Sequence, residues 1–240
     1  MAREAVQSGA PLPSIKERRL RFRQETVDAI LVTARAVIQE QGVAALNLNE
    51  VARRLGVSGQ ALAKYFPNKA ALYDALYLMG HRLFREAEEE VWRTTPPDWE
   101  RIRQWFEVRF ALACEHSDLY HLIWEHSVPG FMPSEAREQE IRMMLAGARG
   151  MIGEVIEAEG LDAGLPLERV VDILLAVRHG IIAEHLGKRD FLPPGSDRFR
   201  GLLPDVLAVL KQAWAPKPQR SPRPADSASP PRGAGEKEGG

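Results

Sequence analysis

The chain has 240 residues, a net charge of −1 and 45% hydrophobic residues, a composition typical of globular proteins with sizeable cores. Its single cysteine, Cys114, excludes a disulfide within the chain, and no apolar run approaches the length that crosses a membrane. No basic and apolar leader opens the sequence, so we expect a cytoplasmic protein that does not enter membranes.

The small net charge hides an uneven distribution along the chain. Residues 1–69 hold 11 Lys and Arg against 6 Asp and Glu, and the remaining residues hold 21 against 27. The first part therefore carries a net charge of +5 and the rest a net charge of −6. A basic head on an acidic body is the arrangement expected of a protein that docks one end on DNA.

The beginning of the chain predicts a flexible basic arm over residues 1–21. Residues 1–13 are poor in apolar side chains and contain two prolines, so we expect them to be disordered. The stretch KERRLRFR, from Lys16 to Arg23, holds five bases and one acid. Two interpretations stay open for it: a solvated lead-in, or an arm that contacts phosphates or enters the minor groove of DNA.

Three helices are expected next. An apolar stripe at helical spacing predicts a helix over residues 23–41. Residues 47–66 indicate two short helices joined at Gly56, with Asn47 placed to cap the first and Ser58 the second. Pro67 ends the second helix, because proline disfavours helical geometry in the residue before it. Such a helix-turn-helix presents the start of its second helix to the major groove of DNA.

The residues of this region resemble a known family. The run AI-x(3)-A-x(2)-V-I-x(2)-Q-G is followed by EVARRLGVS and then by AL-x-K-YFPNK-x(2)-L. In order and spacing these elements resemble the TetR-type DNA-binding domain over residues 22–84. The resemblance implies an all-α protein with a three-helix DNA-binding head, a long linking helix, and a helical body that binds ligand and forms dimers.

The start of the second short helix carries the side chains best placed for DNA, because its free N–H groups and its dipole favour phosphate. Gln60 has the paired donor and acceptor that read adenine. The resemblance implies backbone contacts for Tyr65 and Lys69, whereas Ala63 departs from the tyrosine that is usual in the family. The candidate DNA-binding residues are Asn47, Asn49, Ser58, Gly59, Gln60, Ala61, Lys64, Tyr65 and Lys69.

The rest of the chain indicates a helical body over residues 85–214 and a disordered tail over residues 215–240, which hold six prolines. A long helix is expected from residue 69 to 92, with Glu88 among the acids that load its far end. No alternating strand pattern follows. Helices are expected over residues 98–116, 118–127, 134–159, 167–186 and 197–214. The segments LYHLIWEHSVPGFMPSE and RHG are similar to one C-terminal subgroup of the family.

We expect an apolar ligand pocket in the body, lined by aromatic and methionine side chains with few polar ones. Taken singly, aromatic and methionine residues at helical spacing are usually part of a core, and it is as a set that they suit a pocket. Arg109 is costly to bury alone, and two partners stay open for it: an internal glutamate, or an anionic or carbonyl-bearing ligand. The candidate ligand-binding residues are Trp105, Arg109, Phe110, His121, Trp124, Phe131 and Met143.

The last two helices predict a homodimer. The helix over residues 167–186 is apolar on almost every side. The final helix carries a second apolar stripe, which consists of Leu203, Val206, Leu207, Leu210 and Trp214. Two such helices from each subunit would form a four-helix bundle, as the resemblance implies. The alternative is that both helices belong to the core of their own chain.

Together these features predict a DNA-binding regulator: a repressor released from its double-stranded DNA operator by a small apolar or amphipathic effector. The alternatives are a static structural DNA-binding protein without effector and a helical enzyme with a DNA-binding head. No nucleophile–base pair or nucleotide fingerprint occurs, so we expect no catalytic residue and no cofactor. His116, His121 and His126 recur every five residues and cannot share one helix face, so we expect no metal site.

Overall fold

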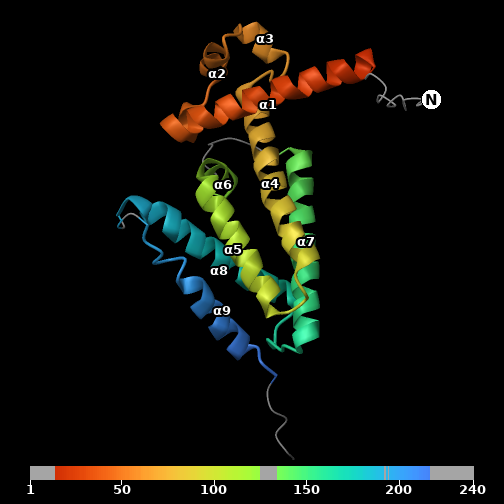
Figure 1. Cartoon of the computed structure of the whole chain (residues 1–240), viewed down its shortest axis with the longest axis vertical. Coiled ribbons are helices and arrows are strands. Elements are labelled where there is room, and N and C mark those ends of the chain that lie inside the picture. Colours follow the sequence, from red (N-terminus) through yellow and green to blue (C-terminus); the bar gives the residue numbers. More distant parts are fainter. Residues whose placement is uncertain (1–13, 125–133, 192, 194, 217–240) are drawn as a thin grey trace, which may run out of the picture.

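The computed structural model describes residues 14–124, 134–191, 193 and 195–216, and its fold is all-α (Figure 1). The elements in chain order are α1 (Ile15–Gln41), the 3-10 turn η1 (Val43–Ala45), α2 (Leu48–Leu55), α3 (Gly59–Ala63), α4 (Lys69–Thr94), α5 (Trp99–Glu115), α6 (Ser117–Trp124), α7 (Glu135–Glu159), α8 (Leu167–Lys188), η2 (Arg189–Phe191) and α9 (Leu202–Ala213). All the expected helices are present, and the last begins at Leu202 rather than at residue 197. The disorder predicted for residues 1–13, and nearly all of the predicted tail, concern residues outside the described ones.

The head consists of α1, α2, α3 and the first turns of α4, at the top of Figure 1. Apolar side chains from these helices form one core, which includes Ile30, Ala34, Val37, Leu46, Val51, Leu62, Phe66, Leu72 and Leu76. Leu122 from α6 belongs to the same core and is 5% exposed. The head is therefore packed directly on the body, because α6 supplies part of its apolar interior.

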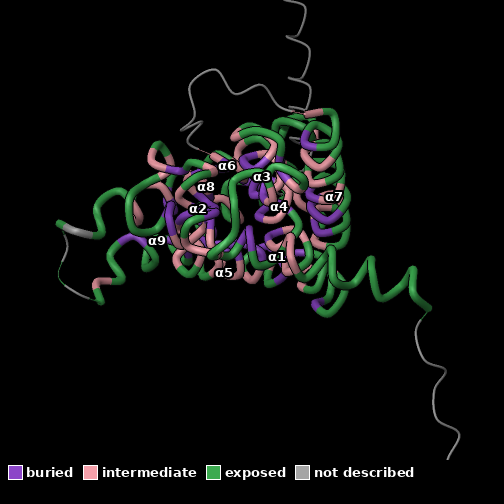
Figure 2. Tube along the Cα trace, turned by 90° about the horizontal axis from the view of Figure 1, so that it is seen from above, coloured by how far each residue is buried: buried purple, intermediate pink, exposed green. Residues whose placement is uncertain are grey.

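The first helix begins at Ile15, before the expected start at residue 23, so the basic stretch is helical rather than a flexible arm. Ser14 and Glu17 form a reciprocal capping box: Ser14 Oγ accepts the N–H of Glu17 at 3.2 Å, and the Glu17 carboxylate accepts the N–H of Ser14 at 2.6 Å. This pair satisfies two free donors and defines the start of the helix. Seen from above, this end of α1 projects from the rest of the molecule and is exposed throughout (Figure 2).

The body consists of the remainder of α4 and α5 to α9. α4 packs against α5, α6 and α7, while α9 packs against α5. α7 and α9 lie at opposite edges of the body (Figures 1 and 2). The body core is rich in large side chains, among them Tyr77, Phe84, Ile102, Trp105, Phe106, Phe110, Leu119, Tyr120, Met151, Val155, Leu174 and Ile182. Within the described residues no helix combines the length and the apolarity needed to span a bilayer.

The buried face of α4 differs from the expected one. Helical spacing in the sequence predicts a buried stripe of Leu72, Leu76, Met79, Leu83, Ala87 and Val91. The residues that are buried are Leu72, Tyr73, Leu76, Tyr77, Gly80, His81, Phe84 and Glu88. The prediction that Glu88 lies with the outer acids is wrong, because its side chain is 1% exposed and meets two buried arginines.

α6 crosses α4 at unusually close range beside Gly80. A Cβ atom at this position would lie 2.6 Å from Cδ1 of Ile123 and 3.3 Å from Cβ of Leu119. A side chain at residue 80 would therefore require the end of the Ile123 side chain to move and Leu119 to shift by a few tenths of an ångström. This close approach places α6 between the head core and the body core.

The stripe expected between subunits lies largely inside the chain's own core. Leu203, Leu207 and Trp214 are 1%, 2% and 6% exposed, because α9 packs them against α5. The prediction that these three residues pair with a second subunit is therefore wrong. A second apolar row on the adjoining face of α9 points outward and includes Leu202, 42% exposed, and Val209, 64% exposed.

Candidate functional site

The helix-turn-helix is held by side-chain caps at both of its helices. Asn47 Oδ1 accepts the N–H of Glu50 at 2.8 Å at the start of α2, and Ser58 Oγ accepts the N–H of Ala61 at 3.2 Å at the start of α3. Between them Gly56 adopts φ 68° and ψ 26°, the left-handed conformation that turns the chain sharply after α2. The sequence predicted each of these features.

The expected DNA-binding residues gather around this turn. Asn47, Asn49, Ser58, Gly59, Gln60 and Lys64 are exposed, whereas Ala61, Tyr65 and Lys69 are half-buried. Asn47 is already engaged, since its Nδ2 also donates to the carbonyl of Ala45 at 3.2 Å. Lys69 Nζ donates to the carbonyl of Ala44 at 3.2 Å. Gln60 and Lys64 are the longest exposed polar side chains of the set, and both lie on or directly after α3.

The guanidinium groups of α2 are tied to carboxylates within the head. Glu50 accepts from Arg53 at 2.8 Å and from Arg54 at 2.7 Å, and Arg54 also donates to Glu40 of α1 at 2.7 Å. The hydrogen bonds from the two arginines lower the pKa of Glu50 to about 2. Glu50 therefore braces α2 against α1 through Arg54 instead of completing a reciprocal capping box with Asn47.

The basic end of α1 approaches the end of the helix-turn-helix. The guanidinium carbon of Arg23 lies 5.4 Å from the centroid of the Tyr65 ring. Lys16, Arg18, Arg19 and Arg21 precede it on the same helix and are exposed. Exposed cations therefore surround the first turns of α1, and Arg23 brings one of them to the ring of Tyr65 after α3.

A buried charged cluster occupies the body at the junction of α4, α5 and α8. Glu88 Oε1 accepts from Nε of Arg109 and from Nη1 of Arg178, at 2.7 Å in each case. The three residues are 1%, 1% and 4% exposed. Burial alone raises the pKa of Glu88, but the charges of the two arginines outweigh it, so the pKa lies below its ordinary value. The internal glutamate is thus the partner of Arg109.

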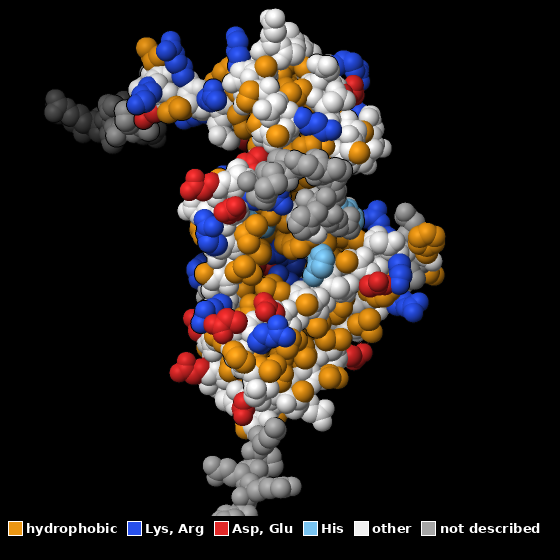
Figure 3. Space-filling model, turned by 180° about the vertical axis from the view of Figure 1, so that it is seen from behind, with side chains coloured by type: hydrophobic (Ala, Val, Ile, Leu, Met, Phe, Trp, Pro, Cys, Tyr) orange, Lys and Arg blue, Asp and Glu red, His pale blue; other side chains and the backbone are white. Residues whose placement is uncertain are grey.

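Aromatic rings surround the cluster. The guanidinium carbon of Arg109 lies between two rings, 4.6 Å from the centroid of Phe84 and 4.8 Å from that of Trp124. The guanidinium carbon of Arg178 lies 3.9 Å from the centroid of Trp105. Such stacking replaces part of the hydration that buried cations lose. Seen from behind, the body is hollowed on this face, with Lys or Arg side chains at the bottom of the hollow, hydrophobic side chains around it and histidine at its edge (Figure 3).

His81 adds a buried neutral imidazole to this region. It is 3% exposed, and its ring centroid lies 5.8 Å from that of Trp124. Burial, followed by the charges of Arg109 and Arg137, lowers the pKa of His81 to about 3. The imidazole is therefore neutral at physiological pH.

The structure brings together some of the expected ligand-binding residues and separates others. Trp105, Arg109 and Trp124 meet in the buried cluster. Phe110 belongs to the same core, but its ring packs against that of His185, with 4.8 Å between the two ring centroids. Met143 is 45% exposed on α7 and does not line the cluster. Phe131 lies outside the described residues.

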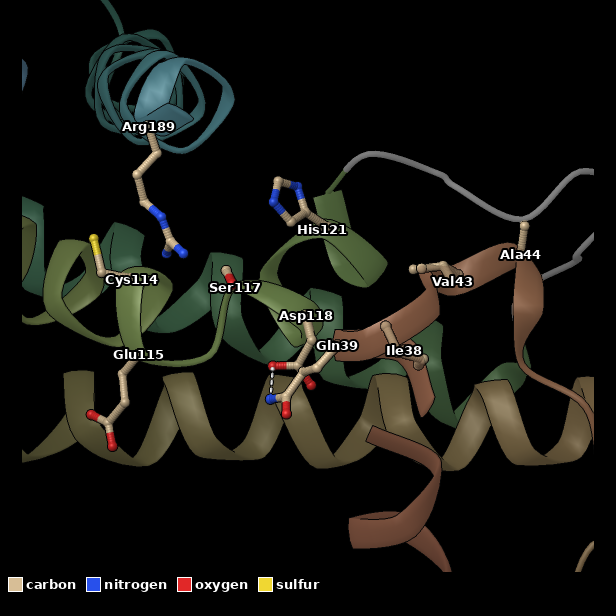
Figure 4. A pocket seen from close by; sticks show the side chains of 11 residues that line it. Ile38, Gln39, Val43, Ala44, Cys114, Glu115, Ser117, Asp118, His121 and Arg189 are labelled. Carbon is tan, nitrogen blue, oxygen red and sulfur yellow. Dashed lines mark hydrogen bonds between the residues drawn. The ribbon is translucent and has the colours of Figure 1, made fainter. Parts of the chain in front are cut away.

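His121 lines a different hollow, a groove between head and body with a volume of about 750 Å³ (Figure 4). On one side it is lined by Gln39 of α1 and Val43 of η1, and on the other by Asp118 and His121 of α6. Asp118 accepts from Nε of Arg35 at 2.7 Å and from Gln39 Nε2 at 3.2 Å. The groove therefore lies where α1 of the head is hydrogen-bonded to α6 of the body.

The sequence did not indicate three residues of these networks as parts of a site: Arg35, His81 and Asp118. Arg178 appeared there only within the RHG segment. A signal for Glu88 exists, because Tyr77, His81, Phe84 and Glu88 follow one another at steps of four, three and four residues on one helix face. Arg35 and Asp118 are 83 residues apart, and no local pattern joins them. Among the described residues, no group of three or more His, Cys, Asp or Glu side chains is placed to hold a metal ion.

Comparison with known proteins supports the assignment of the head. The sequence model of bacterial regulatory proteins of the tetR family matches residues 30–76. These residues run from the middle of α1 through the helix-turn-helix to the first turns of α4. None of the curated proteins compared with the chain matches it.

Solved structures match the whole fold. A protein of unknown function from Rhodococcus sp. RHA1 has 21% identity and a TM-score of 0.65, over 79% of this chain and 95% of that one. The transcriptional regulator FadR from Bacillus subtilis, solved in complex with stearoyl-CoA, has 18% identity and a TM-score of 0.65, over 77% and 97%. The ketosteroid transcriptional regulator KstR2 of Mycobacterium tuberculosis has 16% identity and a TM-score of 0.58, over 80% and 96%.

At these identities the structural matches establish the fold, while the sequence match establishes the head. The capped helix-turn-helix lies within the matched residues. Residues 30–76 match the tetR family of bacterial regulatory proteins, and the described chain has the fold of solved structures that include transcriptional regulators.

Proposed function

We propose that the chain is a homodimeric repressor that leaves its DNA operator when a small apolar or amphipathic ligand binds in the body. The observation that carries this proposal is the course of α4. This helix begins at Lys69 beside the helix-turn-helix and holds Glu88 in the buried cluster of the body. The boundary between a head of residues 22–84 and a body of residues 85–214 falls inside it. A helix of this kind transmits a displacement at one end to the other.

A second connection runs through α6. Near its start Asp118 is hydrogen-bonded to Arg35 of the head, and at its end Trp124 covers Arg109 of the cluster. A ligand that displaces Trp124 therefore acts on the helix that anchors α1. Such a ligand favours one arrangement of head and body over another, which is a population shift between two states.

The nature of the ligand follows from the composition of the body core. Large aromatic and aliphatic side chains dominate this core, and its buried polar residues include Glu88, Arg109 and Arg178 of the cluster. The matched FadR structure contains stearoyl-CoA, an amphipathic molecule, in a protein of the same fold. This likeness supports a ligand with an apolar part in the present chain.

The outward faces of α8 and α9 support a dimer. On α9 the outward apolar row consists of Leu202, Val206, Val209 and Ala213. On α8 a row of mostly small residues is half-buried or exposed, namely Ile173, Ala176, Val177, Gly180 and Gly187. Ile173, Val177 and Val206 pack partly against their own core, whereas Leu202 and Val209 are exposed. Apolar side chains exposed in this way are typical of subunit interfaces. A twofold dimer would present two copies of α3 to successive major grooves about 34 Å apart.

Selection from random duplex DNA tests the DNA-binding part of the proposal. The full-length chain should enrich two half-sites related by twofold symmetry. Cloned upstream of a promoter, the enriched site should reduce transcription in vitro when the protein is added. Binding without sequence preference would instead indicate a static structural DNA-binding protein.

Light scattering tests the dimer. Val209→Glu should yield monomers, because it places a charge in the outward row. Ala208→Glu is the matched control: Ala208 is exposed on the same helix but does not belong to this row, so the variant should stay dimeric. Dimers that persist in Val209→Glu at micromolar concentration would place the interface elsewhere.

A further inference from the structure

The buried cluster of the body is short of negative charge. The described carboxylates that are buried are those of Glu88 and Asp118, and Asp118 is paired with Arg35 at the head. Glu88 alone therefore serves both Arg109 and Arg178. Burial, with the charge of Arg109 adding to it, lowers the pKa of Arg178 to about 10 although Glu88 opposes the shift. Counted over the described residues, Glu88, Arg109 and Arg178 together carry one net positive charge at a buried position.

Polar groups without a hydrogen-bond partner in this site include Nη1 of Arg109 and Nε2 of His81, both on buried side chains. Both residues flank the ring of Trp124, which is half-buried at the end of α6. A missing acceptor next to an excess positive charge indicates a place for an anion.

The surroundings restrict the kind of anion. The excess is a single charge, so a singly charged group neutralises the site, whereas a phosphate group would leave it negative. A carboxylate also matches the planar, two-pronged donor geometry of a guanidinium. Phe84, Tyr120 and Trp124 adjoin the cluster with apolar rings, which suit a hydrocarbon rather than a sugar or a nucleotide.

From these observations we infer that the effector is an amphipathic carboxylate: its carboxylate accepts a hydrogen bond from Nη1 of Arg109 beside His81, and its hydrocarbon part packs against the aromatic rings. The inference rests on the proposed function, because it names the ligand class of the same body. Entry of the carboxylate displaces the ring of Trp124 from Arg109. Binding is thereby coupled to α6, whose Asp118 is bonded to the head.

Calorimetric titration of the DNA-free protein tests the inference with straight-chain probes of 6 to 18 carbons. Each carboxylic acid is compared with the alcohol and the alkyl phosphate of the same chain length. At the optimal length, the carboxylate should bind at least tenfold more tightly than the alcohol, the size of one charge-assisted hydrogen bond. The alkyl phosphate should bind more weakly than the carboxylate.

Two variants with opposite effects make the test specific. Arg109→Met leaves Glu88 and Arg178 as a balanced pair, so it should fold and lose the tenfold preference for the carboxylate. Glu88→Gln increases the positive excess and should keep or raise that preference. Arg103→Met, on the exposed side of α5, is the matched control and should behave as wild type.

Three results would overturn the inference. They are a series in which no carboxylate binds more tightly than its alcohol, a preference that survives in Arg109→Met, and a phosphate that binds best. Because DNA is absent, failure of the proposed function is recognised separately: carboxylates would then bind as expected and leave operator affinity unchanged.

Discussion

Arg35 of α1 and Asp118 of α6 form a two-pronged ion pair across the boundary of head and body. Nε of the arginine lies 2.7 Å from Oδ2 of the aspartate, and Nη2 lies 3.0 Å from Oδ1. The aspartate side chain is 2% exposed and that of the arginine 16%. Burial raises the pKa of Asp118, but the hydrogen bond and the charge of Arg35 lower it by more than burial raises it. The pKa of Asp118 therefore lies below its ordinary value. The pair fixes the orientation of the head on the body.

A double-mutant cycle measures the strength of this link. Asp118→Asn should lower the free energy of unfolding by about 3 kcal/mol, because it leaves Arg35 without its partner at a partly buried site. Combined with Arg35→Met it should show a coupling of about 1–3 kcal/mol, measured by urea unfolding. Additive effects of the two substitutions would show that the contact does not hold the head.

The buried cluster predicts a large loss of stability when its carboxylate is removed. Glu88→Gln leaves two buried arginines without a counter-charge and should cost about 3–5 kcal/mol in the free energy of unfolding. Glu86→Gln changes an exposed acid of the same helix and should stay within about 0.5 kcal/mol of wild type. Chemical unfolding at neutral pH distinguishes the two. A Glu88→Gln variant as stable as the control would contradict the assigned pairing.

His81 predicts a specific dependence of stability on pH. The unfolded chain binds a proton at this residue below its ordinary pKa of 6.5, whereas the folded chain does so only near its lowered pKa of about 3. Between these values the unfolded state holds more protons, so stability falls as the pH is lowered, by about 1.4 kcal/mol per pH unit at most. Other groups add to this loss in the wild type.

The comparison with His81→Leu isolates the contribution of the imidazole. From pH 7 to pH 4 the free energy of unfolding of the wild type should fall relative to that of the variant, because the variant lacks this proton. Curves that run parallel over the whole range would mean that His81 takes up its proton as readily in the folded state as in the unfolded state.

Replacing Gln60 and replacing Lys69 should impair DNA binding in different ways. Gln60→Ala should cost about 1–3 kcal/mol on the selected operator and relax preference at one base pair of each half-site. Lys69→Ala should weaken binding to all sequences about equally and reduce the salt dependence. Binding curves on operator and scrambled DNA at two salt concentrations separate these effects. Equal loss of specificity in both variants would contradict the roles assigned to Gln60 and Lys69.

Local sequence rules predicted the head almost completely. The caps at Asn47 and Ser58 and the left-handed Gly56 depend on neighbours within a few residues, so they are visible in sequence. The start of α1 lies earlier than its apolar stripe indicates, because the capping box of Ser14 and Glu17 begins the helix within a highly charged stretch.

The body was predicted as a set of helices, but its interior was not. Glu88 is an acid in an acidic stretch, and only the arginines of α5 and α8 explain why it is buried. Likewise the apolar stripe of α9 fits either a partner subunit or its own chain. The choice depends on how α5 packs, which no local pattern contains.

The most direct test of the account is the operator affinity of the full-length protein at fixed salt, measured with and without the tightest-binding carboxylate of the series. At 100 times its dissociation constant, a ligand that binds only the DNA-free arrangement stabilises that arrangement by about 2.7 kcal/mol, so operator affinity should fall about a hundredfold. By linkage, operator DNA should weaken ligand binding by the same factor. Saturation of the body with ligand while operator affinity stays unchanged would contradict the account.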